Sequence, residues 1–451
     1  MESNLILIIF GYFFFAIIGL AREIYFIKIN KKIAIVSMCR IMYVLFLAVI
    51  PGIIFCGRLG ETLYSTVIDY DDRYIWTFWA GLIYTVIGYI AFELGYVLKQ
   101  KEIKPKEENQ NQKIIIFSSV ITLISFISLL LWSSGYGGII EIINKANSIR
   151  AGFIKSGGNV AFFKHFVPLS MISSLLLFNA LFVSKTVKGV LRQVYSFVVF
   201  CCSLIIALIY IIANDGRMLA GVFILLFVLI SLKNSYEVKG VKISKLIIRS
   251  IILIAVVFVL ILNSENFFAL FRKTAEEEKS ESLGFMGTVT KEFSFIVSGL
   301  QSAFKTRING TGGFMFKNDL INGIFAWLPT SLKPITLADV WDYNTMLLAS
   351  GSHGQSPTSI TAQSVYDLGT LGILFIPFVY GCIIKKIEIL LEAHKNSTFY
   401  NTVYLVLGFY LAKGIAYFSM YNIMMNIFFI VIAMLVYTIF KKFSLKGSQF
   451  N

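Results

Sequence analysis

The chain has 451 residues, of which 57% are hydrophobic and 15% aromatic, and its mean hydropathy is +0.77. A chain this apolar has too little polar surface to fold as a soluble globule, so the sequence predicts a membrane protein. The formal net charge of +15 comes from basic residues scattered over short connections, a distribution that orients helices against an anionic leaflet. No nucleic-acid partner is therefore expected.

Eleven apolar runs are long enough, or nearly so, to cross the roughly 30 Å of a bilayer core as helices. In chain order they are 4–21, 34–55, 75–98, 114–132, 161–184, 193–213, 218–232, 246–263, 368–384, 399–418 and 421–440. The first has no preceding basic region and no small-residue cleavage site, which favours a signal anchor over a removed signal peptide. The sequence predicts an all-α polytopic membrane protein with about eleven transmembrane helices, and residues 1–451 form a single integral membrane domain.

The lysines and arginines fall on alternate sides of these runs. Well over half of the 40 basic residues lie in six connections on one side, 22–40, 99–113, 185–192, 233–249, 385–395 and 441–451. By the positive-inside rule that side is the cytoplasm. The expected topology has the N-terminus outside and the C-terminus in the cytoplasm.

Two outer connections carry many of the remaining polar residues. The shorter, 133–160, is glycine-rich at both ends, and the longer, 264–367, far exceeds an ordinary loop. Three stretches of the longer loop have helix-like spacing, 291–305, 320–332 and 339–349. Each is expected to be an amphipathic helix in the membrane interface, with Trp327 and Trp341 at headgroup depth. A large, partly helical extracytoplasmic loop favours chemistry at the outer membrane face, whereas transporters generally place their sites near the midplane.

Asn214-Asp215-Gly216-Arg217 separates two apolar runs on the outer side. A tight turn there would hold the Arg217 guanidinium at the mouth of the bundle, where its planar fork and permanent charge suit a phosphate or pyrophosphate. The structural alternative is a surface turn whose arginine reaches lipid headgroups.

Four further cations on the outer side are candidates for substrate binding: Arg150, Arg272, Arg307 and Lys413. Lys413 lies inside a span, where a lysine is costly unless it faces a cavity or a partner. Snorkelling from one turn below the surface is the alternative for Lys413, and an ordinary surface position is the alternative for the three arginines.

His353 lies among glycines and serines just ahead of the run 368–384 and is a candidate general base for a sugar hydroxyl. An exposed histidine without a role is the alternative. Asp69 and Asp71 form a D-x-D pattern that could hold a divalent metal, although acidic outer loops are common. Glu93, near the inner end of its span, is expected to cap a helix or to form a structural pair. No nucleotide-binding, zinc-protease, haem or flavin pattern occurs, so no cofactor and no metal are expected.

The chain resembles the Wzy-type polymerases of O-antigen and capsular polysaccharide repeat units. The resemblance rests on the plan of many spans with one large late outer loop, and on the turn 214–217. It also rests on Gly354-Gln355-Ser356-Pro357-Thr358, Ala362 and Tyr366-Asp367-Leu368-Gly369-Thr370-Leu371-Gly372-Ile373. This chain has Asp367-Leu368-Gly369 at a position where the family more commonly has an Asn/Phe–Gly pair.

The resemblance implies a metal-independent glycosyltransferase with a C-type membrane fold in the bacterial cytoplasmic membrane. Its substrates would be polyprenyl-diphosphate-linked oligosaccharides, and the growing chain would move from its lipid diphosphate onto an incoming lipid-linked repeat. Arg217, with Arg150, Arg307 or Lys413, would stabilise the leaving pyrophosphate. His353 would accept the proton, with Asp215 in reserve. Membrane lipids, a chain-length regulator and a flippase are the further partners considered.

Three alternatives remain. An O-antigen-ligase-like transferase would share the plan but pass the glycan to a different acceptor. A lipid-linked oligosaccharide flippase or exporter would need charges in mid-span and short outer loops. A metal-dependent C-type transferase would depend on Asp69 and Asp71.

Overall fold

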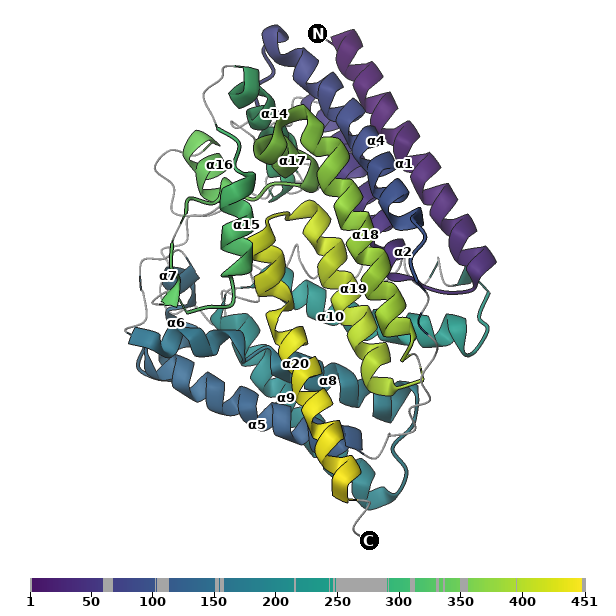
Figure 1. Ribbon diagram of the computed structural model, residues 1–451, viewed down its shortest axis with the longest axis vertical. Coiled ribbons are helices and arrows are strands. Elements are labelled where there is room, and N and C mark those ends of the chain that lie inside the picture. Colours follow the sequence, from purple (N-terminus) through teal and green to yellow (C-terminus); the bar gives the residue numbers. More distant parts are fainter. Residues whose placement is uncertain are drawn as a thin grey trace. The chain divides into compact units, whose positions relative to one another are not determined.

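The computed structural model describes residues 2–59, 68–101, 103, 113–150, 154, 158–214, 216–242, 244–245, 248, 290, 292–308, 313–329, 332–335, 337–348, 356–394 and 396–447. Within these residues the chain is helical and contains no strand (Figure 1). Nine helices of the described part are long and apolar enough to cross a membrane. The protein is thus a polytopic helical membrane protein.

The longer helices are α1 (Glu2–Asn30), α2 (Ile35–Val44), α3 (Ile50–Leu59), α4 (Ile75–Val97), α5 (Lys113–Ser134), α8 (Leu169–Phe178), α9 (Val190–Ala213), α10 (Arg217–Glu237), α18 (Gly372–Glu392), α19 (Thr398–Ala416) and α20 (Met420–Gly447). The shorter helices are α6 (Ile139–Asn144), α7 (Ala146–Arg150), α14 (Phe295–Ile308), α15 (Phe316–Ile324), α16 (Val340–Leu348) and α17 (Ile360–Leu368). A π-helical turn, Leu45–Val49, joins α2 to α3 without interrupting the span.

Nine of the eleven predicted spans are confirmed as long apolar helices. The run 246–263 lies, apart from one residue, outside the described residues. The run 399–418 forms α19 but is not among the nine, because Asn401 and Lys413 lower its hydropathy. The run 368–384 belongs to a longer helical segment that begins at Ile360.

The chain divides into two compact units by its internal contacts. Unit 1 comprises 1–103, 277–390 and 408–425, and unit 2 comprises 104–276, 391–407 and 426–451. Unit 1 therefore contains all the described residues of the long loop, together with the end of α19 and the start of α20.

Glycines bring α4 and α18 into backbone contact in unit 1. A Cβ atom at Gly95 would overlap the carbonyl oxygen of Phe378, and one at Gly381 would overlap that of Phe92. Small residues at such crossings let helices approach closely in a membrane, where dispersion contacts replace the hydrophobic effect as the driving force. This crossing supports the helices against which α17 packs.

A buried ionic network joins α1, α2 and α4 in the same unit. The Arg40 guanidinium donates to both carboxylate oxygens of Glu93, at 2.6 and 2.8 Å, and to Glu23 at 3.2 Å. Arg22 donates to Glu93 at 2.6 Å. The Arg40 side chain is only 3% exposed. The expectation that Glu93 forms a structural pair is confirmed.

The three amphipathic stretches of the long loop do form helices α14, α15 and α16, with shifted ends for the first two. However, α14 packs against α4 and α17 and buries Leu300, Ala303 and Phe304 in a common core, whereas the sequence predicted an interfacial helix. Its apolar positions are covered by protein because α17 supplies a matching apolar stripe. The indoles of Trp327 and Trp341 donate to the carbonyls of Met424 and Phe418, at 2.7 and 2.9 Å.

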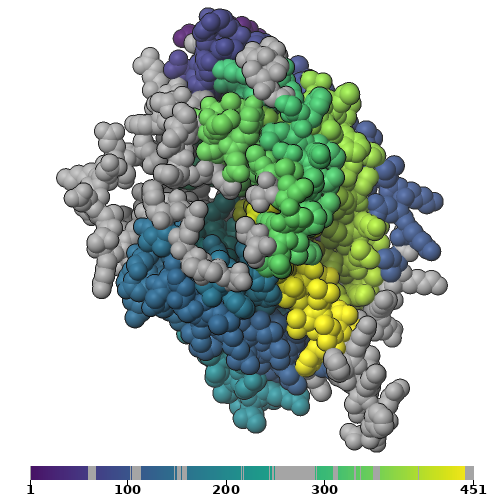
Figure 2. Space-filling model, turned by 60° about the vertical axis from the view of Figure 1, so that its left-hand side comes forward, coloured from purple at the N-terminus to yellow at the C-terminus, as the bar shows by residue number. Residues whose placement is uncertain are grey.

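Unit 2 is built on α5, α8 and α9, which pack against one another. Helices α6 and α7 follow α5, and α6 contacts both α5 and α9. Figure 2 shows this stretch of the chain in blue. Trp132, at the end of α5, is the centre of an apolar cluster that also holds Ile142, Val167 and Ala213. This cluster ties the loop after α5 to the end of α9.

Candidate functional site

The segment Thr358–Asp367, which forms most of α17, carries many polar residues and is buried inside unit 1. Its polar side chains are at most 1% exposed: Thr358, Ser359, Thr361, Gln363, Ser364 and Asp367. Ser359 begins the helix by accepting a hydrogen bond from the Ala362 N–H, and Gly369, with φ of 67°, ends it. Polar groups this deep in a membrane protein are expensive unless they are partnered, and they commonly mark functional sites.

Three buried carboxylates surround this segment. Asp319 of α15, Asp339 just before α16 and Asp367 of α17 are 2%, 7% and 1% exposed. Asp319 accepts from the Met420 N–H at 3.1 and 3.2 Å, so it caps the first turn of α20. Asp367 accepts from the Gln363 amide at 3.2 and 3.3 Å.

Asp339 accepts from the Trp341 N–H at 3.3 Å and from the Ser419 hydroxyl at 3.4 Å. It therefore caps α16 and also contacts the segment between α19 and α20. The three carboxylates have a structural role as caps and hydrogen-bond acceptors, which accounts for part of their burial.

Burial raises the pKa of Asp319, and the negative charge of Asp339 raises it further, while the Met420 N–H acts in the opposite direction. Burial also raises the pKa of Asp339. Carboxyl groups with raised pKa values can exchange protons closer to neutral pH than ordinary aspartates. The long loop thus places two carboxyl groups with raised pKa values, those of Asp319 and Asp339, in the interior of unit 1.

The break between α19 and α20 is held against α17 by backbone hydrogen bonds. The Phe418 N–H donates to the Thr358 carbonyl at 2.7 Å, and the Phe418 carbonyl accepts from the Thr358 hydroxyl at 3.1 Å. Trp341 binds the same carbonyl. Non-helical backbone at membrane depth is tolerated where protein buries it, as here.

Arg307, in the last turn of α14, lies at the C-terminal end of α17. Its guanidinium donates to the carbonyls of Val365, at 3.0 Å, of Tyr366, and of Gly313, at 3.3 Å. It also lies 4.5 Å from the centre of the Phe314 ring. The structure therefore places this predicted phosphate-binding arginine as a cap for the unpaired carbonyls of α17.

Lys413 has a different environment. It is half-buried in α19, and its Nζ lies 6.0 Å from the centre of the Tyr410 ring and 5.6 Å from that of Tyr417. Among the described residues its ammonium forms no hydrogen bond and no ion pair. Tyr417 packs on Phe295 at 5.0 Å, which adds an aromatic wall. The ammonium is thus held in an aromatic setting, with no anionic partner in the part of the chain that the structure describes.

The remaining predicted site residues are only partly placed. Arg150 ends α7 and Arg217 begins α10, and only their backbones are described. His353, Asp215 and Arg272 lie outside the described residues. The structure therefore brings together Arg307, the three carboxylates and the α19–α20 break within unit 1, with Lys413 about one turn before that break.

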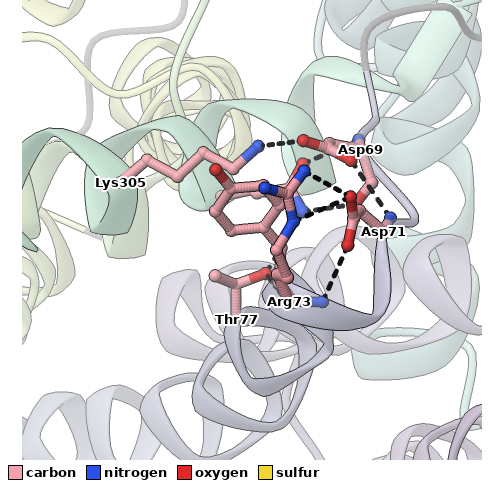
Figure 3. Close-up of polar contacts among 7 residues, drawn as sticks. Asp69, Asp71, Arg73, Thr77 and Lys305 are labelled. Atoms are coloured by element: carbon pink, nitrogen blue, oxygen red, sulfur yellow. Dashed lines mark hydrogen bonds and ion pairs between the residues drawn. The ribbon is translucent and has the colours of Figure 1, made fainter.

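The acidic pattern at Asp69 and Asp71 forms ion pairs with two cations (Figure 3). Asp69 accepts from the Lys305 ammonium at 2.6 Å, and Asp71 accepts from the Arg73 guanidinium at 2.6 and 3.0 Å. Hydrogen bonding from Lys305 lowers the pKa of Asp69, and that from Arg73 lowers the pKa of Asp71 to about 2. Gln301 ties the backbone of Asp69 to α14.

Each carboxylate of this pattern already has a positive partner, which disfavours its use as a metal ligand. Within the described part of the chain, no group of three or more His, Cys, Asp or Glu side chains is placed to hold a metal ion. The arrangement is that of a structural link between α14 and the segment before α4.

Sequence reasoning singled out neither Asp319 nor Asp367 as a site residue. A signal existed for both, since each is an acidic residue beside an apolar stretch of a loop that was expected to be structured. No family model matches the chain, and the comparisons with curated proteins and with solved structures give no match either.

Proposed function

We propose that the protein is a metal-independent membrane glycosyltransferase. It polymerises polyprenyl-diphosphate-linked oligosaccharide repeat units into surface polysaccharide at the outer face of the bacterial cytoplasmic membrane. The observation that carries the proposal is the Lys413 ammonium, half-buried in unit 1 with no anionic partner among the described residues. An intramembrane lysine in this state is suited to an anionic substrate group.

The proposed step breaks the bond between the anomeric carbon of the growing chain and its lipid diphosphate. A hydroxyl oxygen of the acceptor sugar forms the new glycosidic bond, and the bonding electrons leave with the diphosphate oxygen. Lys413 would stabilise that developing charge. Arg217 and Arg150 are the other cations proposed to bind a diphosphate. The acceptor hydroxyl gives its proton to a general base.

His353 is the proposed base. It precedes by three residues a segment that is anchored to α16, where the Ser356 N–H donates to the Thr345 hydroxyl at 2.6 Å and the Asn344 amide donates to the Ser356 carbonyl at 3.2 Å. These bonds fix the chain at Ser356. Asp215 remains the reserve candidate.

A second candidate function is export of a lipid-linked oligosaccharide. The buried carboxylates Asp319, Asp339 and Asp367 favour it, because carboxyl groups that exchange protons inside a membrane protein can couple transport to a proton gradient. Their partners Met420, Trp341 and Gln363 are structural, however, and the long folded loop is not needed for export.

Gel analysis of surface polysaccharide separates these functions. A strain lacking the protein would be complemented with the wild type, with Lys413→Met, or with Lys145→Met as a matched control. Lys145 is 43% exposed and pairs with Glu141 at 2.9 Å. We expect single repeats in the deletion strain, a ladder with the wild type and the control, and a depleted ladder with Lys413→Met.

Two other results would overturn the proposal. Full-length polymer that accumulates on its lipid carrier in the deletion strain would indicate a ligase. An exporter would be indicated if lipid-linked units accumulated on the cytoplasmic side in the deletion strain, while the units that still crossed the membrane gave an unchanged ladder. Immunodetection in membrane fractions would show that all variants are present in equal amounts.

A further inference from the structure

Unit 2 contains a second ammonium that has no anionic partner among the described residues. Lys164 lies near the end of the short helical turn Gly158–His165, ahead of α8, and its side chain is half-buried. Its Nζ is 5.6 Å from the centre of the Trp132 ring. Among the residues that the structure describes, Lys164 forms no hydrogen bond and no ion pair.

The indole that Lys164 contacts belongs to a group of aromatic rings. Trp132 is 1% exposed, and its ring lies 5.9 Å from that of Tyr210 and 6.5 Å from that of Tyr136. A cation–π contact contributes about 0.5–2 kcal/mol, less than the desolvation penalty of an ammonium that loses its water. The contact alone therefore does not explain why a lysine stands here.

Carboxylates near Lys164 along the chain do not compensate it. Glu141, the acid of the loop between α5 and α8, is paired with Lys145. Ala213, the last residue of α9, shares the apolar cluster of Trp132, and α10 begins four residues later at Arg217. The fold thus brings the lysine, the aromatic rings and the start of α10 to one end of unit 2.

We propose that Lys164 binds the phosphate group of a second lipid-linked substrate. The inference rests on the proposed function, because polymerisation joins two molecules that each carry a lipid diphosphate and so needs two phosphate sites. Lys413 provides one in unit 1, and Lys164 provides the other in unit 2. The same phosphate chemistry could come from an anionic phospholipid headgroup, and the experiment must separate the two sources.

The test is a count of bound ligand by native mass spectrometry. The full-length protein would be placed in nanodiscs of phosphatidylcholine and titrated with polyprenyl diphosphate, with polyprenol as the control that lacks phosphate. We expect two equivalents of the diphosphate on the wild type and one on Lys164→Met or Lys413→Met. Loss of a charge-assisted hydrogen bond should weaken binding at the altered site about tenfold or more.

Three control variants keep the result interpretable. Lys164→Arg should retain both equivalents because it keeps the charge, and Lys145→Met should retain both because its lysine already has a partner. Lys164→Gln serves as a second neutral variant if Lys164→Met is not monodisperse in size-exclusion chromatography.

The outcomes separate this inference from the proposed function. One equivalent on the wild type, lost only in Lys413→Met, would overturn the Lys164 site and leave the polymerase proposal standing. Two equivalents on every variant would overturn both. Displacement of the Lys164-dependent equivalent by phosphatidylglycerol at equal concentration would show a headgroup site and overturn its assignment to substrate.

Discussion

Replacement of Lys413 by methionine should make the protein more stable and less active. Methionine fills a similar volume without a charge. A lysine at the centre of a membrane helix costs roughly 2.5–3.5 kcal/mol on insertion scales. Lys413 is half-buried, and its two tyrosine contacts offset part of this penalty. We therefore expect the free energy of unfolding to rise by about 1–2 kcal/mol.

The effect on activity has the opposite sign. A hydrogen bond between the ammonium and a phosphate contributes about 1.5–3 kcal/mol, so its loss should slow polymerisation by about 10- to 150-fold. Thermal unfolding in detergent, followed by tryptophan fluorescence, measures the first effect, and chain growth from lipid-linked repeats measures the second. Lys413→Arg, which keeps the charge, should recover much of the activity. A Lys413→Met protein that is both less stable and less active, with Lys413→Arg restoring both, would show a structural cation and refute the reasoning.

Three further predictions concern unit 1. Glu93→Gln leaves the buried Arg40 guanidinium undercompensated and should lower the free energy of unfolding by about 3 kcal/mol, seen as a lower melting temperature. Gly95→Ala should destabilise by about 1–3 kcal/mol because its methyl group forces α4 away from α18, whereas Gly313→Ala, with open space within 4 Å, should be nearly neutral. Asp319→Asn should flatten the pH dependence of stability. The raised pKa of Asp319 means that the wild type loses stability as pH rises from about 4 through that pKa, and an amide cannot titrate. Equal slopes for wild type and variant would contradict this.

The membrane spans could be predicted from the sequence because hydropathy over twenty residues is a local property. The pairing of Glu93 was also predictable, because an acidic side chain inside an apolar run needs a nearby cation. The helix over 339–349 also followed from spacing, and α16 matches it within a residue at each end.

The interior of the site could not be predicted in the same way. The burial of α14 depends on the stripe that α17 presents to it, and the two are separated by two other helices in the chain. Asp319 is a cap for α20, whose first residue lies 101 positions further on. Arg307 was predicted to bind phosphate because of its residue type. Its N–H groups instead donate to carbonyls of α17, because the last carbonyls of a helix have no partner within the helix.

Lys164 shows a related limit. This residue, which lies inside the apolar run 161–184, was not singled out from the sequence, and only the packing of Trp132 and Tyr210 distinguishes it. Aromatic residues from α5 and α9 meet in unit 2 through contacts that no local pattern specifies.

The most direct test of the proposed function is reconstitution. The purified protein would be placed in liposomes with lipid-linked repeat units isolated from the deletion strain, without ATP and with EDTA present. We predict a ladder of products that lengthens with time and is depleted in Lys413→Met. Lipid-linked units that cross the bilayer without gaining length, or a ladder that appears only when a divalent metal is added, would contradict the account.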